Sequence, residues 1–359
     1  MKRALLLALL LHGAGALEAQ QQPIFFHPEQ DYGSAAVRTP ADAFVNRAFS
    51  VLVFDYSPRE LGRIHWSAGW AAVRDALAHP GAAVDRAGGL NKVLRQEFLP
   101  SGGHILTWAW APNYAEHVVA GGITYRYMSE WLDAHGVPAP HLAAGVVYVA
   151  SMVGNEMMEM PGGPPGISGT VADLLVFDPA GMVLFSFDAP SRFFAHTLEA
   201  ADWSPMPGLA FPHARLMNFG QTMSYKVPLP LTSRVRVLFL IGEAATTGLR
   251  VALRDDYHLS AATGFETRGR TVDPATGRES IDVAWSGELY LDRRNSLLVS
   301  IQYSDRVDSG LQVNVFPGVL PGVLHPAGIW LGRSRQGQWN TGLAFRRTLG
   351  LGLGADFVR

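Results

Sequence analysis

The stretch from Ile281 to Asp292, which reads IDVAWSGELYLD, decides the class of fold. Its apolar residues alternate with polar or small residues, and this period of two is typical of a strand with two different faces. The same alternation returns in three later segments: 297–304, 311–315 and 339–346. From about Leu216 onward we therefore predict an antiparallel β-barrel of about ten strands.

The alternation alone does not say which face of the strands points outward. In a soluble barrel or sandwich the apolar face points inward, whereas in a membrane barrel it points to lipid. The opposite face is rich in Gly, Ala, Ser, Asn and Gln, which suits a barrel interior better than a surface in water. Aromatic residues near predicted strand ends suit a membrane interface: Trp285, Tyr290, Tyr303, Phe316, Trp330, Trp339 and Phe357. We therefore favour the membrane barrel, with the soluble barrel or sandwich as the alternative.

Residues 1–19 have the composition of a secretory signal peptide. Lys2 and Arg3 precede an apolar run over 4–11, and small residues follow up to Ala19. The run is shorter than the roughly 20 apolar residues of a membrane-spanning helix. We therefore expect an exported protein, placed in a bacterial outer membrane or alternatively in the periplasm.

The rest of the chain divides into three parts of different composition. We expect an extended segment over 20–40, a helical domain over 41–212 and the barrel domain over 213–359, which together give an α+β fold. Within the helical domain, Thr39-Pro40-Ala41-Asp42 has the cap, proline and acid of a helix start.

Two strongly apolar segments of the helical domain are predicted to be buried. The first, 140–158, is apolar on nearly every face, which is typical of a helix enclosed by protein. The second, 171–187, is interpreted as buried helix interrupted by a turn at Asp178-Pro179-Ala180-Gly181.

Composition excludes several classes of function. The 359 residues carry a net charge of -2, so no basic surface is expected to bind nucleic acid. The chain has no cysteine, which excludes a lipid-anchored lipoprotein, disulfides and thiol chemistry. It also lacks the H-E-x-x-H, G-x-S-x-G and phosphate-loop motifs, and we expect neither a cofactor nor a metal.

Polar residues within apolar helical sequence are the candidates for a catalytic site. Glu116 and His117 share one predicted helix, Glu156 and Glu159 share one face of another, and Asp173 interrupts an apolar run. Carboxylates beside a histidine could ligate a divalent metal or form an acid–base set.

Each candidate also has a structural interpretation. Glu116 follows Asn113 by three residues, as in a capping box, and Asp173 could cap a following helix. His117 alone is more often a packing residue. Two acids at a helix C-terminus, Glu156 and Glu159, oppose the helix dipole, which favours a functional role for them. On balance we favour a role other than catalysis.

Arginines recur on the predicted strands at Arg234, Arg236, Arg250 and Arg254. In a barrel they would line the interior and pair with Glu243, Glu266 and Glu288, and this interpretation is preferred because interior arginines are normally neutralised. The alternative is that they bind a ligand or the phosphates of lipid headgroups.

Three groups of residues resemble a family of uncharacterised bacterial exported proteins. These are Asn113 with Glu116 and His117, then Asn155 with Glu156 and Glu159, then Ala172-Asp173-Leu174 with Asp178-Pro179-Ala180-Gly181. The resemblance spans roughly 110–320 and implies a helical domain followed by a β-rich half in an exported protein. It implies no established reaction.

These observations leave three hypotheses for function. The first is an outer-membrane protein of structural or transport type, with the helical domain at the periplasmic mouth of a small barrel or inside it. The second is an outer-membrane hydrolase that acts on lipid through the Glu/His set. The third is a soluble periplasmic protein that binds a lipid or another small molecule. The expected partners are outer-membrane lipids.

Overall fold

The computed structural model describes residues 23–54, 59–99, 110–158, 167–242, 244–272, 279–306, 309–346 and 350–357. The predicted signal peptide lies outside these ranges, as do Glu159 and Glu243.

The N-terminal half is helical. Its α-helices are α2 (Gly33–Val37), α3 (Pro40–Ala48), α4 (Val51–Phe54), α5 (Trp66–Ala78), α6 (Pro80–Arg86), α7 (Leu90–Val93), α8 (Trp110–Pro112), α9 (Gly121–Ala134), α10 (Pro140–Met158), α11 (Ile167–Ala172), α12 (Asp178–Phe185) and α13 (Asp188–Arg192). Segments with the wider π-helical turn lie among them: η2 (Leu94–Phe98), η4 (Asn113–Ala120), η5 (Asp173–Phe177) and η6 (Phe193–Thr197). Short 3-10 helices are η1 (Leu61–Arg63) and η7 (Gly322–Leu324).

The C-terminal half is a single sheet. Its strands are β1 (Ala201–Asp202), β2 (Gly208–Phe211), β3 (Arg215–Met217), β4 (Thr222–Leu229), β5 (Thr232–Gly242), β6 (Ala244–Ala252), β7 (Tyr257–Val272), β8 (Glu279–Arg293), β9 (Ser296–Ser304), β10 (Leu311–Val315), β11 (Ala327–Arg333), β12 (Trp339–Phe345) and β13 (Gly352–Phe357). The strand order is β1-β4-β5-β6-β7-β8-β9-β10-β11-β12-β13-β2-β3. Neighbouring strands are antiparallel except β13 and β2, which are parallel.

The α+β class predicted from the sequence is confirmed, but the closed barrel is not. Among the described residues the sheet has 13 strands rather than about ten, and it ends at β1 and β3 without joining them. Helices lie at both of these edges. Met223 and Tyr225 of β4, the neighbour of β1, share a core with Phe185 of α12, and Leu216 of β3 shares one with Met158 of α10.

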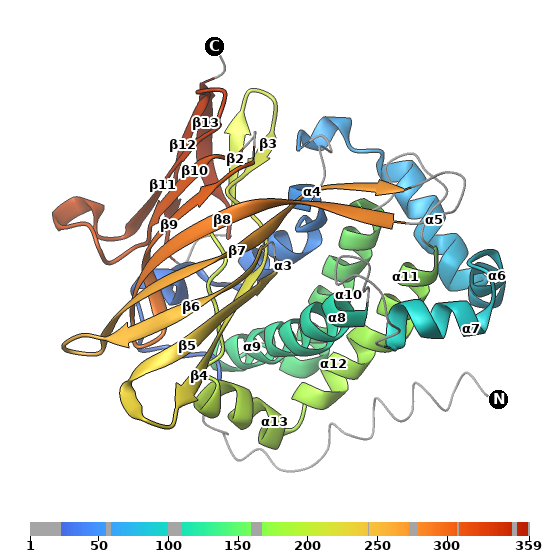
Figure 1. Ribbon diagram of the computed structural model, residues 1–359, viewed down its shortest axis with the longest axis horizontal. Coiled ribbons are helices and arrows are strands. Elements are labelled where there is room, and N and C mark those ends of the chain that lie inside the picture. Colours follow the sequence, from blue (N-terminus) through green and yellow to red (C-terminus); the bar gives the residue numbers. More distant parts are fainter. Residues whose placement is uncertain are drawn as a thin grey trace.

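The sheet curves around the N-terminal helices (Figure 1). Val37 of α2 joins a core on its concave side together with large side chains from the strands and from residues just beyond them: Trp203, Leu238, Tyr290, Leu297, Phe316 and Trp330. The segment 20–40, which was expected to be extended, therefore contains a short helix. It forms because Val37 packs into the core of the sheet and the Ala35 amide donates to Ser296 of β9, so that tertiary contacts outweigh the weak propensity of so short a helix.

The remaining helices form a layer beside the sheet (Figure 1). Tyr125 and Met128 of α9 pack against Ala144, Tyr148 and Met152 of α10. Leu174 and Met182 pack against the same cluster, so η5 and α12 lie next to α10.

Two predictions about the helices are confirmed and two are wrong. The Thr39 hydroxyl caps α3 by accepting a hydrogen bond from the amide of Asp42 at 3.1 Å, and α10 has the bounds expected for it. The turn predicted at Asp178-Pro179-Ala180-Gly181 is instead the first turn of α12, where proline is well tolerated. The predicted burial of 140–158 and 171–187 is wrong for one face of each segment, which exposes apolar side chains such as Val146 and Val183.

Within the described ranges, no single helix has the length and hydropathy needed to cross a bilayer. One bent pair, Gly169–Phe185 with Asp188–Thr197, reaches those values when taken together, with an angle of 82° between its halves.

Candidate functional site

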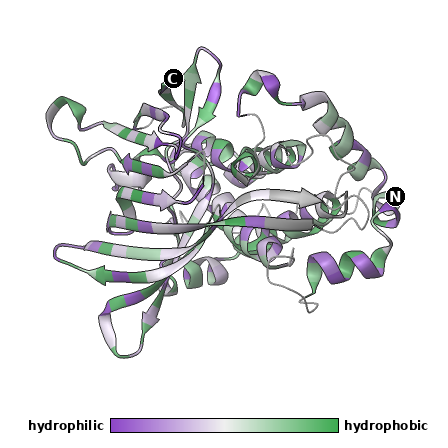
Figure 2. Ribbon diagram, turned by 45° about the horizontal axis from the view of Figure 1, so that its top comes forward, coloured by the Kyte–Doolittle hydropathy of each residue, from purple (hydrophilic) through white to green (hydrophobic). Residues whose placement is uncertain are grey.

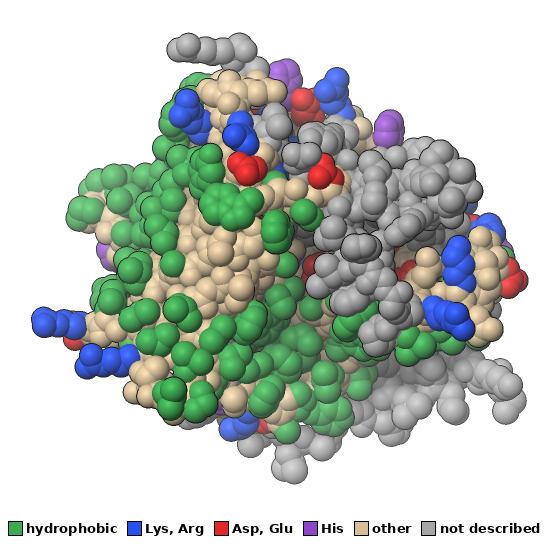
Figure 3. All heavy atoms as spheres, viewed as in Figure 1, with side chains coloured by type: hydrophobic (Ala, Val, Ile, Leu, Met, Phe, Trp, Pro, Cys, Tyr) green, Lys and Arg blue, Asp and Glu red, His purple; other side chains and the backbone are tan. Residues whose placement is uncertain are grey.

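The outer face of the sheet is apolar. The side chains of Leu289 and Ile301, which pair across β8 and β9, are 48% and 39% exposed. The row continues through Val313 of β10 to Leu331 of β11. Figure 3 shows hydrophobic side chains over this face, with Lys and Arg at its margins.

The inner face of the same strands is buried and carries polar side chains beside the apolar core described above. Figure 2 shows hydrophobic and hydrophilic residues alternating along the strands. The buried polar residues that point inward are Ser260, Ser286, Glu288, Asp292, Ser300 and Asn314. A sheet in water has the opposite arrangement, with its apolar face on the core. The exposed apolar side chains of these strands thus differ from the orientation expected for a soluble barrel or sandwich.

Aromatic side chains line one end of the apolar face. Phe265 pairs with Trp285, and the Trp285 ring lies 6.1 Å from that of Tyr303. Further along the sheet, Trp339 pairs with Phe357. Four of the seven aromatics predicted to lie at an interface are thus exposed in this row. Tyr290, Phe316 and Trp330 are instead buried on the concave side, because their positions in the alternation point inward.

Charged residues lie beyond both ends of the apolar face. At one end, Arg294 in the β8–β9 turn pairs with Asp256 in the β6–β7 turn at 2.8 Å. The hydrogen bond from Arg294 lowers the pKa of Asp256, so this exposed carboxyl is ionised at neutral pH. At the other end, Arg335 pairs with Asp305 at 2.9 Å. The apolar surface is therefore a band with charge on both sides.

Two of the four predicted arginines are neutralised inside the sheet. Arg250 contacts Asp292 and Glu199 at 2.6 Å each, and Arg236 contacts Glu199 at 2.7 Å. The structural interpretation of Arg250 and Arg236 is supported, although the partners among the described residues are Glu199 and Asp292 rather than Glu266 or Glu288. Glu288 instead accepts hydrogen bonds from Thr246, Ser286 and Tyr290. Arg234 and Arg254 are exposed near the turns of the sheet.

The predicted catalytic residues His117 and Asp173 meet in a buried cluster between helices. The Nδ1 atom of His117 lies 3.1 Å from the carboxylate of Asp178, and its Nε2 atom lies 3.8 Å from that of Asp173. The Tyr148 hydroxyl donates to Asp178 at 2.8 Å, and Arg47 lies 3.7 Å from the same carboxylate. Five elements, α3, η4, α10, η5 and α12, supply these groups.

The π-helical turns explain why these residues meet. Asp173 and Asp178 are five positions apart, which places them on different faces of a regular α-helix. The π-helical hydrogen bonding of η5 instead aligns residues five apart on one side. His117 lies in the π-helical segment η4. Sequence periodicity of 3.6 gave no signal for either segment, so the proximity of Asp178 to Asp173 was missed. Tyr148 and Arg47 were missed because they reach the cluster from the separate helices α10 and α3.

The geometry of the cluster suits cohesion between helices better than catalysis. Both ring nitrogens of His117 face carboxylates, so the ring is not placed to take a proton from a nucleophile. Arg47 also donates to the carbonyl oxygen of Glu116 at 3.0 Å and to the side chain of Gln221 in the loop before β4. One guanidinium thereby ties α3 to η4 and to the β domain.

The other predicted acids have different surroundings. Glu116 does not complete a capping box, because the helix begins earlier and the Asn113 amide donates to Glu97 at 3.1 Å. Glu156 is fully buried on the face of α10 that carries Tyr148 and Met152. Among the described residues, no group of three or more His, Asp or Glu side chains is arranged to hold a metal ion.

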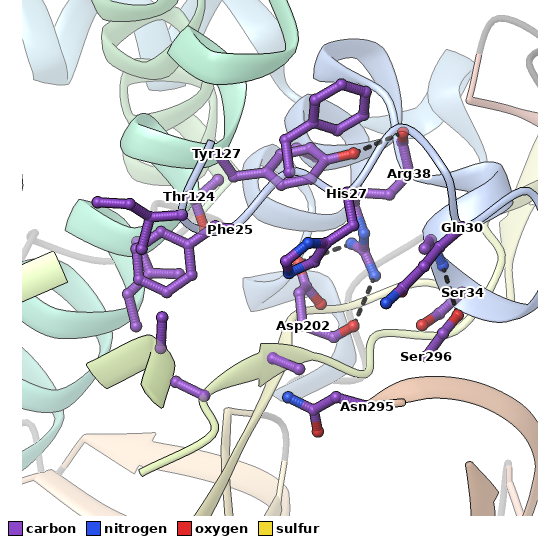
Figure 4. Close-up of a pocket in the computed structure, with 18 of the residues that line it drawn as sticks. Phe25, His27, Gln30, Ser34, Arg38, Thr124, Tyr127, Asp202, Asn295 and Ser296 are labelled. Atoms are coloured by element: carbon purple, nitrogen blue, oxygen red, sulfur yellow. Dashed lines mark hydrogen bonds and ion pairs between the residues drawn. The ribbon is translucent and has the colours of Figure 1, made fainter. Parts of the chain in front are cut away.

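A small cavity lies between the N-terminal segment, α9 and the β8–β9 turn (Figure 4). Arg38 on its wall contacts Asp202 at 2.7 Å and Asp42 at 3.0 Å, and the Tyr127 hydroxyl donates to the carbonyl oxygen of Arg38. The sequence marked Asp42 only as part of a helix start and gave no signal for Arg38 or Asp202. The volume is about 100 Å³, enough for a few waters or a very small molecule.

Comparisons with family models, with curated proteins and with solved structures found no match to this chain.

Proposed function

We propose that the protein is an integral protein of a bacterial outer membrane, with its sheet in contact with lipid and with a structural rather than a channel-forming role. The observation that carries this proposal is that, along the strands, apolar side chains are exposed whereas polar side chains are buried. Leu289 is half exposed, whereas its neighbours Glu288 and Tyr290 are buried. In water this arrangement would expose apolar surface and bury carboxylates, both of which are unfavourable.

The limits of the apolar face also support a bilayer. A membrane-facing sheet has an apolar band about 25 Å tall with aromatic residues at its interfaces. Leu259 and Phe265 of β7 are six residues apart and both point outward, which spans about 20 Å at 3.3 Å per residue. The signal peptide expected from the sequence fits the same location.

The packed interior supports the structural role. Trp203, Tyr290, Phe316 and Trp330 fill the concave side together with α2, and Lys226 is fully buried there. The Lys226 ammonium lies 4.1 Å from the Trp203 ring centre. This filling leaves little room for the water-filled lumen that a wide pore needs.

Single cysteines in this cysteine-free chain test the proposal. Leu289→Cys and Arg254→Cys would each be labelled with a small fluorophore, and the protein reconstituted in phosphatidylethanolamine/phosphatidylglycerol vesicles. Because acyl chains surround position 289, lipids brominated in mid-chain should quench its label at least about two-fold more than the label at the charged turn. Equal quenching at both positions, with release of the protein by an alkaline carbonate wash, would rule out insertion of the sheet.

A further inference from the structure

The helices beside the sheet resemble its strands in that their acidic side chains are buried and their apolar side chains are exposed. In η5 and α12 the carboxylates of Asp173 and Asp178 point inward and are buried. The outward surface of these two elements is instead apolar: Leu175, Val176, Val183 and Leu184, continued by Phe187 just beyond α12, all of them exposed. A helix at a water-exposed surface would place its acids outward and its large apolar residues inward.

Helix α10 adds a second apolar stripe. Leu142, Val146 and Val149 are 64%, 63% and 44% exposed, and their spacing places them on one face. Tyr148 and Glu156 of the same helix point inward. Since Leu174 and Met182 pack against the α10 cluster, the two stripes belong to neighbouring elements.

These helices lie where the sheet is open. On one side, Phe185 of α12 packs against Phe194 of η6, and Phe194 packs against Tyr225 of β4. On the other side, Met158 at the end of α10 shares a core with Leu216 of the edge strand β3. In Figure 3 the hydrophobic surface continues from the sheet onto the helical side near α12.

From these observations we propose that α10, η5 and α12 complete the lipid-facing surface, so that acyl chains contact helices where the sheet does not close. This inference rests on the proposed insertion of the sheet and extends it to the helical half. The helical domain is then part of the membrane-embedded wall rather than a cover at the mouth of a barrel. The buried His117 cluster lies directly behind this wall and joins its helices to α3.

Lipid fits this surface better than a protein partner does. The exposed stripes consist mainly of large apolar side chains, a surface that suits acyl chains, and exposed polar residues such as His141 and Ser186 lie beside them. The apolar surface is also continuous with that of the sheet, which one bilayer would cover as a whole.

The test uses Val183→Cys on α12 and Val149→Cys on α10, each carrying the same fluorophore in the same vesicles. Leu289→Cys reports on the sheet, and Arg74→Cys, at an exposed position of α5, is the matched control outside the apolar surface. We expect brominated acyl chains to quench the labels at 183 and 149 at least about two-fold more than the label at 74. Val and Cys are similar in size, and Phe187→Cys serves as a second reporter if either variant fails to fold.

The outcomes separate the two proposals. If position 289 is quenched while 183 and 149 behave like 74, the helices do not contact lipid and this inference is wrong, although insertion of the sheet stands. If none of the three is quenched, both proposals fail. Efficient crosslinking between two copies of the Val183→Cys variant at high lipid-to-protein ratio would show that a second copy covers the helices, which also contradicts contact with lipid.

Discussion

At the scale of single residues, Arg250 and Arg254 illustrate how differently two similar arginines are used. Arg250 is buried against Asp292, which is itself fully buried. Replacing it with alanine leaves that carboxylate without its main counter-charge, so Arg250→Ala should lower the free energy of unfolding by about 3–5 kcal/mol. Arg254 is exposed, and Arg254→Ala should change it by less than about 0.5 kcal/mol. Denaturant titration in detergent micelles compares the two.

The double variant Arg250→Ala/Asp292→Ala provides the control for this prediction. If the pair acts as a unit, the double variant loses much less stability than the two single variants added together. Additive losses would contradict the coupling of Arg250 to Asp292, and an Arg250→Ala variant as stable as Arg254→Ala would contradict a structural role for Arg250.

The sequence predicted that these arginines pair with acidic residues, but not which acidic residues they pair with. Because burying an unpaired charge is costly, an arginine inside the sheet is expected to contact an acidic residue. Arg250 and Arg236 each do so. The partners Asp292 and Glu199 depend on strand register and on the path of the chain before β1, and neither is encoded in local periodicity. His117 and Asp173 were singled out because they interrupt apolar sequence, whereas Asp178 required knowledge of a π-helical turn.

At the scale of elements, the packing of β11 against β12 predicts how a small substitution in β12 changes the stability of the protein. Trp330 of β11 is fully buried, and a Cβ added at Gly342 of β12 would overlap its ring. Because β12 pairs with β11 on one side and β13 on the other, it cannot move away, and Gly342→Ala should destabilise the protein by about 1–3 kcal/mol. Gly81→Ala in α6, where a Cβ meets nothing within 4 Å, is the matched control.

Thermal unfolding followed by gel mobility would measure both glycine variants. Gly342→Ala should unfold at a lower temperature than the wild type, while Gly81→Ala should match it or exceed it slightly, since alanine favours the helix. Combining Gly342→Ala with Trp330→Leu should recover part of the loss. An unchanged unfolding temperature for Gly342→Ala would show that the Trp330 ring is not fixed as described.

The existence of elements could be predicted better than their environment. The period of two located β8, β9, β10 and β12, and the run over 140–158 predicted α10 with its observed bounds. Its burial was predicted wrongly because a helix that is apolar on every face suits a protein core and a lipid surface equally well. A helix in a protein core and a helix at a lipid surface differ in which faces are buried. In α10 only the face that carries Tyr148, Met152 and Glu156 points inward.

At the scale of the whole molecule, the free energy of a charged substitution should depend on its position across the apolar band. Leu289 lies in the middle of the band, and Leu253 lies at its edge beside the charged β6–β7 turn. In a bilayer, Leu289→Arg should cost about 2–4 kcal/mol, because the charge would sit near the midplane, whereas Leu253→Arg should cost about 0–1 kcal/mol. Both side chains are about half exposed, so they are closely matched in packing.

Folding into lipid vesicles, followed by denaturant titration, would measure this difference. If the sheet instead faced water, arginine at either position would change the free energy of unfolding by similar small amounts, because surface substitutions away from special features are nearly neutral. A difference of less than about 0.5 kcal/mol between the two variants would therefore contradict the membrane location. A large cost confined to position 289 would indicate a low-dielectric medium outside the sheet, since both side chains point away from the interior and are about half exposed.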